Sequence, residues 1–371
     1  MKKNLLIYSF FIMLLGISIL DIISPERTFS ELENRYLNKK TKFTLKSYFD
    51  GSFSKKYENY LNDQFIGRDN WINLKSSTEY ALGKTENNNI LYGNKYFLFE
   101  KVTSIDEKRE NLNISAVNIF AQNCDIPVSV MIVPNSYIVY KEYLPDYAPI
   151  INGEKEIEEI YNNLKNTNNI NLINVMNDKK EKLNEGELLY YRTDHHWTTE
   201  GAYEAYTEYI KSIGMEPVNL KYYEKNYIPD FLGTYYSKSK PLKYKYDTIT
   251  YYDFDNVTME IGEEKYYGLY DISKTDVNDK YSLFLFGNNP LSIIKNNEIN
   301  SQEKLLVIKD SYANSIVPFL SQNFKEIHVI DLRSYSGKIS EYIKENKFDC
   351  VLILYNFTTF IRDSDLVKIK Y

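Results

Sequence analysis

Residues 305–320, "LLVIKDSYANSIVPFL", decide the fold class. The segment begins as an apolar run that ends at Lys309, which is typical of a strand buried on both faces. Asp310 and Ser311 follow, and after them comes a second apolar run of helical length. An apolar strand that leads through a short turn into a helix is the repeating unit of a sheet covered by helices. The segment therefore predicts an α/β domain.

The same alternation continues on both sides of this segment. The expected strands are "IPVSVMIVP" (126–134), "NLINV" (171–175), "ELLYY" (187–191), "EIHVIDL" (326–332) and "CVLILYN" (350–356). The expected helices cover 104–124, 154–166, 198–214 and 337–346, the third with Thr198 or Thr199 as N-cap and Gly214 as stop. Residues 220–300 interrupt the rhythm with short alternating runs and predict a β-rich insertion. We expect a layered domain with a mostly parallel sheet.

The first 23 residues, "MKKNLLIYSFFIMLLGISILDII", predict a membrane anchor. Lys2 and Lys3 precede an almost unbroken apolar run from Leu5 to Leu20. In length the run lies between a signal-peptide core and a short transmembrane helix, and no small-residue cleavage site follows it. We expect an uncleaved signal anchor, with the lysines in the cytoplasm and the rest of the chain outside it. The alternative is a signal peptide that is removed.

Three parts are expected along the chain: the anchor at 1–23, a linker and helical segment at 24–80, and the α/β domain at 81–371. The second part has apolar residues near helical spacing in "FSKKYENYLNDQF" (53–65). The third begins with an expected hairpin at 88–100, with Gly93-Asn94 as its turn.

Composition narrows the function classes. The net charge is −6 and the signs are interspersed, so no basic stripe indicates nucleic-acid binding. The 36 tyrosines suit sheet surfaces and sugar-binding clefts, and a compositional bias explains them equally well. Cys124 and Cys350 each precede an apolar run, so we expect free thiols at strand starts; a disulfide in an exported protein is the alternative.

Two of the three histidines stand together in "YYRTDHHWTTEGAYEAY" (190–206). An expected strand ends here and an expected helix begins, at the carboxyl edge of the sheet, where catalytic groups of open α/β sheets gather. In an extended segment Asp194 and His196 share one face, and His195 points to the other. A carboxylate beside an imidazole can fix its tautomer and stabilise the imidazolium, which a general base requires.

Each of these residues also has a structural interpretation. The Asp194–His196 pair can be a surface pair, and for His195 we favour a packed structural role. Metal binding is not expected, because neighbouring side chains diverge in an extended segment and no third ligand is evident. The chain has no Cys and His spacing typical of a metal site, and no cofactor is expected.

A general base needs a nucleophile, and Ser311 is the candidate. A serine on a strand-to-helix turn exposes its hydroxyl above the sheet, and its own N–H faces a developing oxyanion. The alternative is that Asp310 or Ser311 only caps the helix. Two such sheet-edge sites in one domain, one with Asp-x-His and one with Ser, together favour catalysis.

The chain resembles the DHHW family of exported bacterial proteins. That family is similar to the SGNH-hydrolase-like domain of the alginate O-acetylation proteins, which implies a three-layer α/β domain. The resemblance is carried by "SELENR" (30–35), "DQFIGRDNW" (63–71), "VPNSYIVYKEYLP" (133–145), "RTDHHW" (192–197), "GTYYSKS" (233–239), "GNNP" (287–290), "LVIKDSYANSIVPFL" (306–320) and "DLRSY" (331–335).

By position, the resemblance implies a triad of Ser311, His196 and Asp194. The order Asp, His, Ser along the chain agrees with the alginate acetylation proteins and inverts that of ordinary SGNH esterases. In the wider SGNH class a glycine N–H and an asparagine side chain complete the oxyanion hole. The matching positions are Gly287 and Asn288, with Asn314 behind them.

The sequence also departs from the ordinary SGNH serine block. Lys309 replaces the glycine of Gly-Asp-Ser, which puts the local turn geometry in question, and Pro318 predicts a kink in the following helix. Trp197 and Arg333 are further candidates for substrate binding. For Arg333, binding of an anionic sugar and a structural ion pair are equally supported.

Together with the expected anchor and triad, the resemblance implies a membrane-anchored serine O-acetyltransferase outside the cytoplasm. It would move an acetyl group onto a cell-surface or secreted polysaccharide through an acetyl-Ser311 intermediate. An integral-membrane acyltransferase is the expected partner, because acetyl donors are cytoplasmic. The alternatives are a carbohydrate acetylesterase with the same triad and a non-catalytic polysaccharide-binding or assembly protein.

Overall fold

The computed structural model describes residues 2–30, 35–164, 169–175, 188–254 and 256–371. Most of the "SELENR" motif, at 31–34, lies outside the described residues. The chain divides into two compact units, one formed by residues 1–88 with 237–242 and the other by 89–236 with 243–371.

The first unit is mainly helical. Its helices are α1 (Lys2–Ile23), α2 (Leu45–Phe49), α3 (Ser52–Gln64) and α4 (Arg68–Ala81), and its strands are β1 (Phe29–Ser30), β2 (Arg35–Tyr36) and β3 (Glu86–Asn87). Among the described residues, α1 is the one helix with the length and apolar composition to cross a membrane, over Leu5–Ile23. Gly67, with φ 65°, separates α3 from α4 in the left-handed conformation that glycine adopts at little cost.

A buried carboxylate on α3 binds the segment that follows β2. Asp63 on α3 is 4% exposed and accepts hydrogen bonds from Arg35 (Nη2–Oδ1, 2.6 Å) and from the backbone N–H of Asn38 (2.8 Å). Burial acts to raise its pKa, but these hydrogen bonds outweigh burial and hold the pKa well below its usual range. The carboxylate therefore stays ionised and fixes the segment after β2 against α3.

The second unit contains an eight-stranded sheet in the order β11-β10-β12-β14-β13-β15-β6-β7. The last five strands pair in parallel, and the first three extend the edge in antiparallel pairing. Their bounds are β6 (Val128–Val133), β7 (Ile170–Ile173), β10 (Val257–Ile261), β11 (Glu264–Tyr267), β12 (Leu291–Asn296), β13 (Lys304–Lys309), β14 (Glu326–Ile330) and β15 (Cys350–Asn356). The α/β class and the mostly parallel sheet are confirmed.

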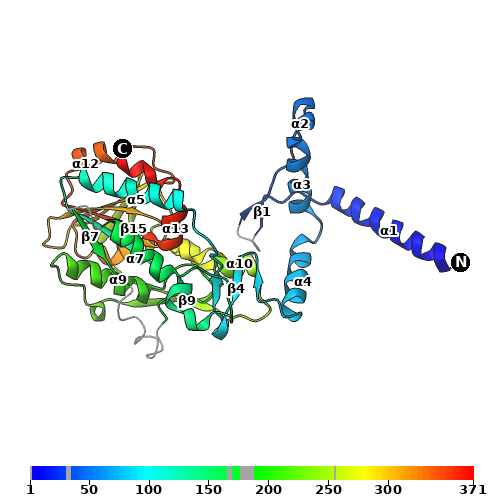
Figure 1. Ribbon diagram of the computed structural model, residues 1–371, viewed down its shortest axis with the longest axis horizontal. Helices are drawn as coiled ribbons and strands as arrows, with labels where there is room; N and C mark the ends of the chain where they lie inside the picture. The colour runs from blue at the N-terminus through cyan, green and yellow to red at the C-terminus, as the bar shows by residue number, and fades with distance from the viewer. Residues whose placement is uncertain (1, 31–34, 165–168, 176–187, 255) are drawn as a thin grey trace. The chain divides into compact units, whose positions relative to one another are not determined.

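Helices cover both faces of this sheet, and Figure 1 shows α5 (Glu107–Gln122) and α12 (Ile339–Asn346) on one side and α9 (Thr199–Ser212) on the other. The remaining helices are α6 (Ser136–Val139), α7 (Gly153–Leu164), α10 (Thr234–Ser239), α11 (Ala313–Leu320) and α13 (Phe357–Arg362). α9 begins as expected, because the Thr198 hydroxyl accepts the N–H of Gly201 at 3.1 Å. Pro318 lies in α11, which ends at Leu320.

The region from 220 to 300 is rich in strands, and most of them join the main sheet. β8 (Lys225–Phe231) and β9 (Asp247–Tyr252) form a separate antiparallel pair, whereas β10, β11 and β12 extend the central sheet. The expected hairpin near residue 90 is present as β4 (Ile90–Tyr92) and β5 (Leu98–Glu100), although its connection is a longer one that contains a short 3₁₀ turn, Asn94–Tyr96.

The expected strand "ELLYY" is wrong over residues 188–191, and residue 187 lies outside the described residues. Residues 188–191 form no strand of the sheet, and their one bridge joins Tyr190 to Trp197 across the DHHW segment. Both tyrosines of the run, Tyr190 and Tyr191, are 1% exposed. The apolar run therefore reflects burial of a loop beneath the site, and burial alone does not separate a loop from a strand.

Candidate active site

Two loops meet near the carboxyl end of β13. One carries the turn Lys309-Asp310-Ser311 and the other carries residues 194–197. Trp197 joins them, because its indole Nε1–H donates to the backbone oxygen of Tyr312 (3.0 Å) and to Ser315 Oγ (2.8 Å). The two motifs singled out in the sequence therefore form one site.

Asp194, His196 and Ser311 form a continuous hydrogen-bonded chain. His196 Nε2 lies 2.8 Å from Ser311 Oγ, and His196 Nδ1 lies 2.6 Å from Asp194 Oδ1. His196 and Asp194 are 5% and 2% exposed, whereas Ser311 is half-buried. This arrangement can transfer the serine proton to an imidazole whose other nitrogen is held by a carboxylate.

The second oxygen of Asp194 has its own partners. Thr234 donates to Asp194 Oδ2 through its backbone N–H (2.7 Å) and its hydroxyl (2.9 Å). Gly233 lies so close that a Cβ there would be 2.2 Å from the Cβ of Asp194. The "GT" that opens the motif at 233–239 thus supplies both the space and the donors that hold the carboxylate.

His195 does not point away from its neighbours, so the prediction that it diverges is wrong. Its Nδ1 lies 2.6 Å from Thr234 Oγ1 and 3.5 Å from Asp194 Oδ1, and its ring centre is 3.7 Å from that of His196. The segment is a bend rather than an extended strand, so the alternation of side chains does not apply.

The imidazole of His196 lies between two rings. On one side it stacks on Tyr281 with ring centres 3.6 Å apart and planes at 8°, and His195 lies on the other. Burial and, after it, the nearby His195 together lower the pKa of His196 to about 4, against the opposing effect of Asp194. For Asp194, burial acts to raise the pKa, but the two histidines hold it well below its usual range.

A buried aspartate shapes the turn that carries the serine. Asp310, 1% exposed, accepts the backbone N–H of Tyr312 (2.9 Å) and both the backbone N–H (2.8 Å) and the side-chain Nδ2–H (2.6 Å) of Asn356. Asp310 therefore ties the turn to the end of β15. Among the described residues, no acceptor takes the backbone N–H of Ser311, which leaves that donor free.

Lys309 fills the place where the resemblance expects glycine, and it has a defined environment. It is 2% exposed, and its Nζ donates to Asn288 Oδ1 (2.7 Å) and Asn314 Oδ1 (2.8 Å) and lies 3.6 Å from Asp331 Oδ2. Burial lowers its pKa to about 8, and Asp331 opposes this effect. An ammonium has no acceptor, so it fixes both amide oxygens toward itself.

The expected oxyanion donors are only partly available. The N–H of Gly287 donates to the backbone oxygen of Phe284 (3.0 Å), which corrects its expected role as a donor to substrate. The Asn288 side chain turns its oxygen to Lys309 and to Asn314 Nδ2 (3.1 Å), and its own Nδ2–H meets no acceptor within the described part of the chain. Among the described residues, Asn288 Nδ2 and the N–H of Ser311 are therefore donors without an acceptor in the protein.

The loop before Asn288 has an uncommon backbone. Leu285, Phe286 and Gly287 have consecutive φ values of 54°, 55° and 87°. A leucine and a phenylalanine in the left-handed region each cost about 1–2 kcal/mol, and such conformations persist where the surroundings enforce them. Here Leu285 is 1% exposed and donates its N–H to Leu269, and the Phe286 ring lies 4.2 Å from that of Tyr266.

Two expected substrate-binding residues have structural contacts. Trp197 is 0% exposed, so it cannot stack on a sugar, and this expectation is wrong. Arg333 forms a paired contact with Asp331, with Nε–Oδ1 at 2.8 Å and Nη2–Oδ2 at 2.5 Å, which is the structural ion pair. Asp331 thus shares its single negative charge between Arg333 and the buried Lys309.

The expectation that the side chains around His196 diverge too far to hold a metal ion is wrong in its geometry. The ligand atoms of Asp194, His195 and His196 lie within 4.8 Å of one another. Both nitrogens of His196, however, are engaged by Asp194 and Ser311, and Asp194 accepts from Thr234 and His196 through its two oxygens. The group is therefore built as a hydrogen-bonded chain.

Three residues of the site carried little signal in the sequence. Thr234 belongs to the motif at 233–239, and its position after a glycine is the only sign of a role in the sequence. Tyr281 and Ser315 had none, although the Tyr281 hydroxyl donates to Ser315 Oγ (3.1 Å) beneath the imidazole. Tyr281 is far from His196 in the sequence, so only the folded structure reveals that their rings are in contact.

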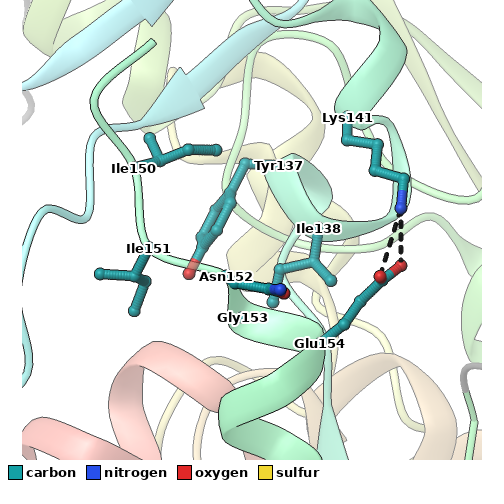
Figure 2. Close-up of a pocket in the computed structure, with 8 residues that line it drawn as sticks. All are labelled: Tyr137, Ile138, Lys141, Ile150, Ile151, Asn152, Gly153 and Glu154. Atoms are coloured by element: carbon teal, nitrogen blue, oxygen red, sulfur yellow. Dashed lines mark hydrogen bonds and ion pairs between the residues drawn. The ribbon is translucent and has the colours of Figure 1, made fainter.

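A separate hollow of about 270 Å³ lies elsewhere in the second unit. Figure 2 shows Tyr137 and Ile138 on one wall, the chain around Asn152 on the other, and the Lys141–Glu154 ion pair at its rim. The Tyr137 hydroxyl has no partner among the described residues and no access to solvent, so it offers no contact to a ligand. No predicted site residue lines this hollow.

Both cysteines are half-buried free thiols. Cys350 begins β15, and its pKa is raised to about 12 by burial, whereas Cys124 precedes β6. The expectation of free thiols holds for both residues, but only Cys350 lies at a strand start, since β6 begins at Val128.

The sequence matches the family described as "DHHW protein" over residues 96–330. No curated protein matches it. Among solved structures, a DHHW family protein from Eubacterium siraeum has a TM-score of 0.65 at 24% identity, over 76% of this chain and 95% of that one.

Two further proteins of known structure share the fold. PatB1 of Bacillus cereus has a TM-score of 0.60 at 21% identity, over 76% of this chain and 99% of that one, and a second PatB1 structure carries a sulfonyl adduct. The O-acetyltransferase domain of AlgJ from Pseudomonas putida has a TM-score of 0.50 at 14% identity, over 76% of this chain and 98% of that domain.

Proposed function

This chain belongs to the DHHW family, and from that premise we propose that it is a membrane-anchored serine O-acetyltransferase. Its acceptor is a cell-surface or secreted polysaccharide, and its catalytic domain lies outside the cytoplasm. The observation that carries the proposal is the chain Asp194–His196–Ser311 with contacts of 2.6 and 2.8 Å. The fold shared with an O-acetyltransferase domain supports the reaction class.

The proposed reaction has two half-reactions. In the first, Ser311 Oγ bonds to the acetyl carbonyl carbon while His196 Nε2 takes the hydroxyl proton, and the carbonyl electron pair moves to oxygen. The tetrahedral intermediate expels the donor's oxygen, which takes that proton from His196. In the second, His196 removes a proton from a sugar hydroxyl, the hydroxyl oxygen attacks the acyl carbon, and Ser311 leaves with the proton.

The oxyanion of each intermediate needs donors that are already in place. The N–H of Ser311 and the Nδ2–H of Asn288 are the open donors near the serine, and we assign them this role. Asn314 acts behind Asn288, because its Nδ2 donates to Asn288 Oδ1 at 3.1 Å.

The proposed location follows from α1. Residues 1–23 form the membrane anchor, residues 24–80 connect it to the catalytic domain at 81–371, and an integral-membrane acyltransferase supplies the acetyl group. The apolar, unburied helix Leu5–Ile23 supports the anchor. A reporter fused after Tyr371 tests it, because activity inside the cytoplasm contradicts the orientation.

The decisive experiment follows the acyl group. After incubation with an activated acetyl ester, mass spectrometry should find one acetyl group on Ser311, and a sulfonyl fluoride should block the same residue. Added oligosaccharide should raise the rate of deacylation and yield acetylated sugar, because a bound acceptor is positioned for attack. Ser311→Ala is the control without label.

Two outcomes contradict the proposal and identify the alternatives. If oligosaccharide leaves the deacylation rate unchanged and only free acetate accumulates, the protein is an acetylesterase. If Ser311 never acquires the acetyl group while oligosaccharide still binds, the protein is a polysaccharide-binding or assembly factor.

The pH dependence of acylation should show the lowered pKa of His196. The base must be neutral, so kcat/KM for an activated acetyl ester should stay constant as pH falls below the ordinary histidine value of about 6.5. It should decrease only as pH falls through about 4. Initial rates corrected with Ser311→Ala test this, and an acidic limb near 6.5 contradicts the burial argument.

Lys309→Met should lower the acylation rate without changing the fold. Methionine fills the volume but no longer fixes the Asn288 amide, so we expect about a tenfold loss, whereas Asn288→Ala removes the donor and costs about 10²- to 10³-fold. The double variant should lose no more than Asn288→Ala, because both act through one donor. If the loss in the double variant equals the product of the two single losses, this positioning role is contradicted. Thermal melts of each variant show whether it is folded.

A further inference from the structure

The turn between α3 and α4 carries an apolar surface that the catalytic proposal does not use. We call residues 64–74 the α3–α4 elbow. Three of its apolar side chains are exposed: Phe65 at 38%, Trp71 at 56% and Leu74 at 58%. Three exposed apolar side chains within one short segment fit an apolar surrounding better than water.

The elbow is joined to the end of α1. Asp21 lies in the last turn of this apolar helix, and its Oδ1 accepts the backbone N–H of Ile66 at 3.0 Å. A carboxylate within a membrane helix is costly unless it has a partner, and the elbow supplies one. Ile66 therefore lies at the level of the last turn of α1.

A second set of contacts fixes this arrangement. The backbone N–H of Arg27 donates to Gln64 Oε1 (2.9 Å), and Gln64 Nε2 donates back to the Arg27 carbonyl (2.9 Å). The Arg27 guanidinium bonds Asp69 Oδ2 at 2.8 Å. The chain that leaves α1 is thus held to both sides of the elbow, so α1 and the elbow act as one piece.

Trp71 lies at the turn itself. Its Nε1 is 3.7 Å from the position that a Cβ of Gly67 would take, next to Ile66. An indole combines an apolar body with one polar N–H, and tryptophan is enriched where a membrane meets water. Its exposed indole beside the end of an apolar helix matches that environment.

The elbow is close to neutral in charge. Arg27 pairs with Asp69, and Arg68 lies 3.5 Å from Asp69 and 3.7 Å from Asp63. These cations are paired within the protein, so contact with a bilayer here should not depend on anionic lipids.

We propose that the α3–α4 elbow lies in the interfacial layer of the bilayer on its extracytoplasmic side, with Trp71 and Phe65 among the lipid headgroups and upper acyl chains. The inference rests on the proposed membrane anchor and adds a second membrane contact to it. This contact fixes how the first unit leaves the membrane.

The two tryptophans of the chain make a direct test. Trp197 is 0% exposed in the second unit, so bromine atoms on lipids should quench Trp71 alone. The full chain is reconstituted in phosphatidylcholine vesicles with bromines near the carbonyl end or the methyl end of the acyl chains. We expect a loss of emission that is larger with the shallow bromines, and no loss in Trp71→Phe.

The controls separate failure of the elbow from failure of the anchor. If the protein stays in the membrane after carbonate extraction but neither lipid quenches it, the elbow proposal is overturned and the anchor stands. If carbonate releases the protein, both are overturned. Equal quenching with phosphatidylglycerol added supports the neutral contact, whereas quenching that requires phosphatidylglycerol overturns it in favour of headgroup recognition by Arg27 and Arg68.

Discussion

We expect His196→Ala to lower the rate of the proposed acetyl transfer from an activated ester by about 10²- to 10⁴-fold, the range for loss of a general base. The reason is geometric, because His196 Nε2 is 2.8 Å from Ser311 Oγ and burial keeps the imidazole neutral. Stopped-flow measurement of acylation is the appropriate assay, since it isolates the step in which the serine loses its proton.

His195→Ala is the matched control in the same tripeptide. His195 contacts Thr234 Oγ1 at 2.6 Å, whereas the ring nitrogen at 2.8 Å from Ser311 Oγ belongs to His196. Loss of one hydrogen bond of about 1 kcal/mol corresponds to roughly a fivefold decrease. If His195→Ala removed the activity and His196→Ala left it near wild type, the assignment of the base would be reversed.

Asp194→Asn should lower the acylation rate by about 10⁴-fold, as expected when a triad carboxylate can no longer fix the tautomer of its histidine. Every partner of this carboxylate is a donor. Oδ1 accepts from the backbone N–H and Nδ1 of His196, and Oδ2 accepts from the backbone N–H and hydroxyl of Thr234. An asparagine NH₂ therefore faces another N–H in either orientation.

Thr234→Val provides the comparison for Asp194→Asn. It removes one hydroxyl donor but keeps the backbone N–H that holds Oδ2, so we expect roughly a fivefold loss. Thermal melts of both variants show whether the fold is retained. An Asp194→Asn variant that is folded and within tenfold of wild type contradicts the role of the carboxylate.

The parallel part of the fold was predictable because its strands are buried on both faces. The runs that became β6, β13 and β15 are apolar almost throughout, and their lengths separate them from helices. The run at 188–191 is equally apolar but folds as a loop, because it lies under the site and not in the sheet. A run of apolar residues indicates burial, and residues 189–191 are buried beneath the site instead of within the sheet.

The site was predictable only where chemistry and turn position coincide in the sequence. Asp194, His196 and Ser311 were placed by the need for a base and a nucleophile at the sheet edge, and their catalytic roles stay predictions. The direction of His195 was not predictable, because a bend removes the alternation that an extended strand imposes. Nor was the burial of Trp197, since its hydrogen-bond acceptors come from the helix that follows Ser311.

The two rings that enclose His196 limit how fast its imidazole can turn over. Tyr281 lies 3.6 Å from one face of the imidazole and His195 lies 3.7 Å from the other, so the ring cannot turn over unless one neighbour moves away. Ring reversal is then tied to a slow breathing of the surrounding protein and not to free side-chain rotation. In the proposed reaction, the same nitrogen of His196 therefore faces Ser311 in every cycle, and no step is needed to reorient the imidazole.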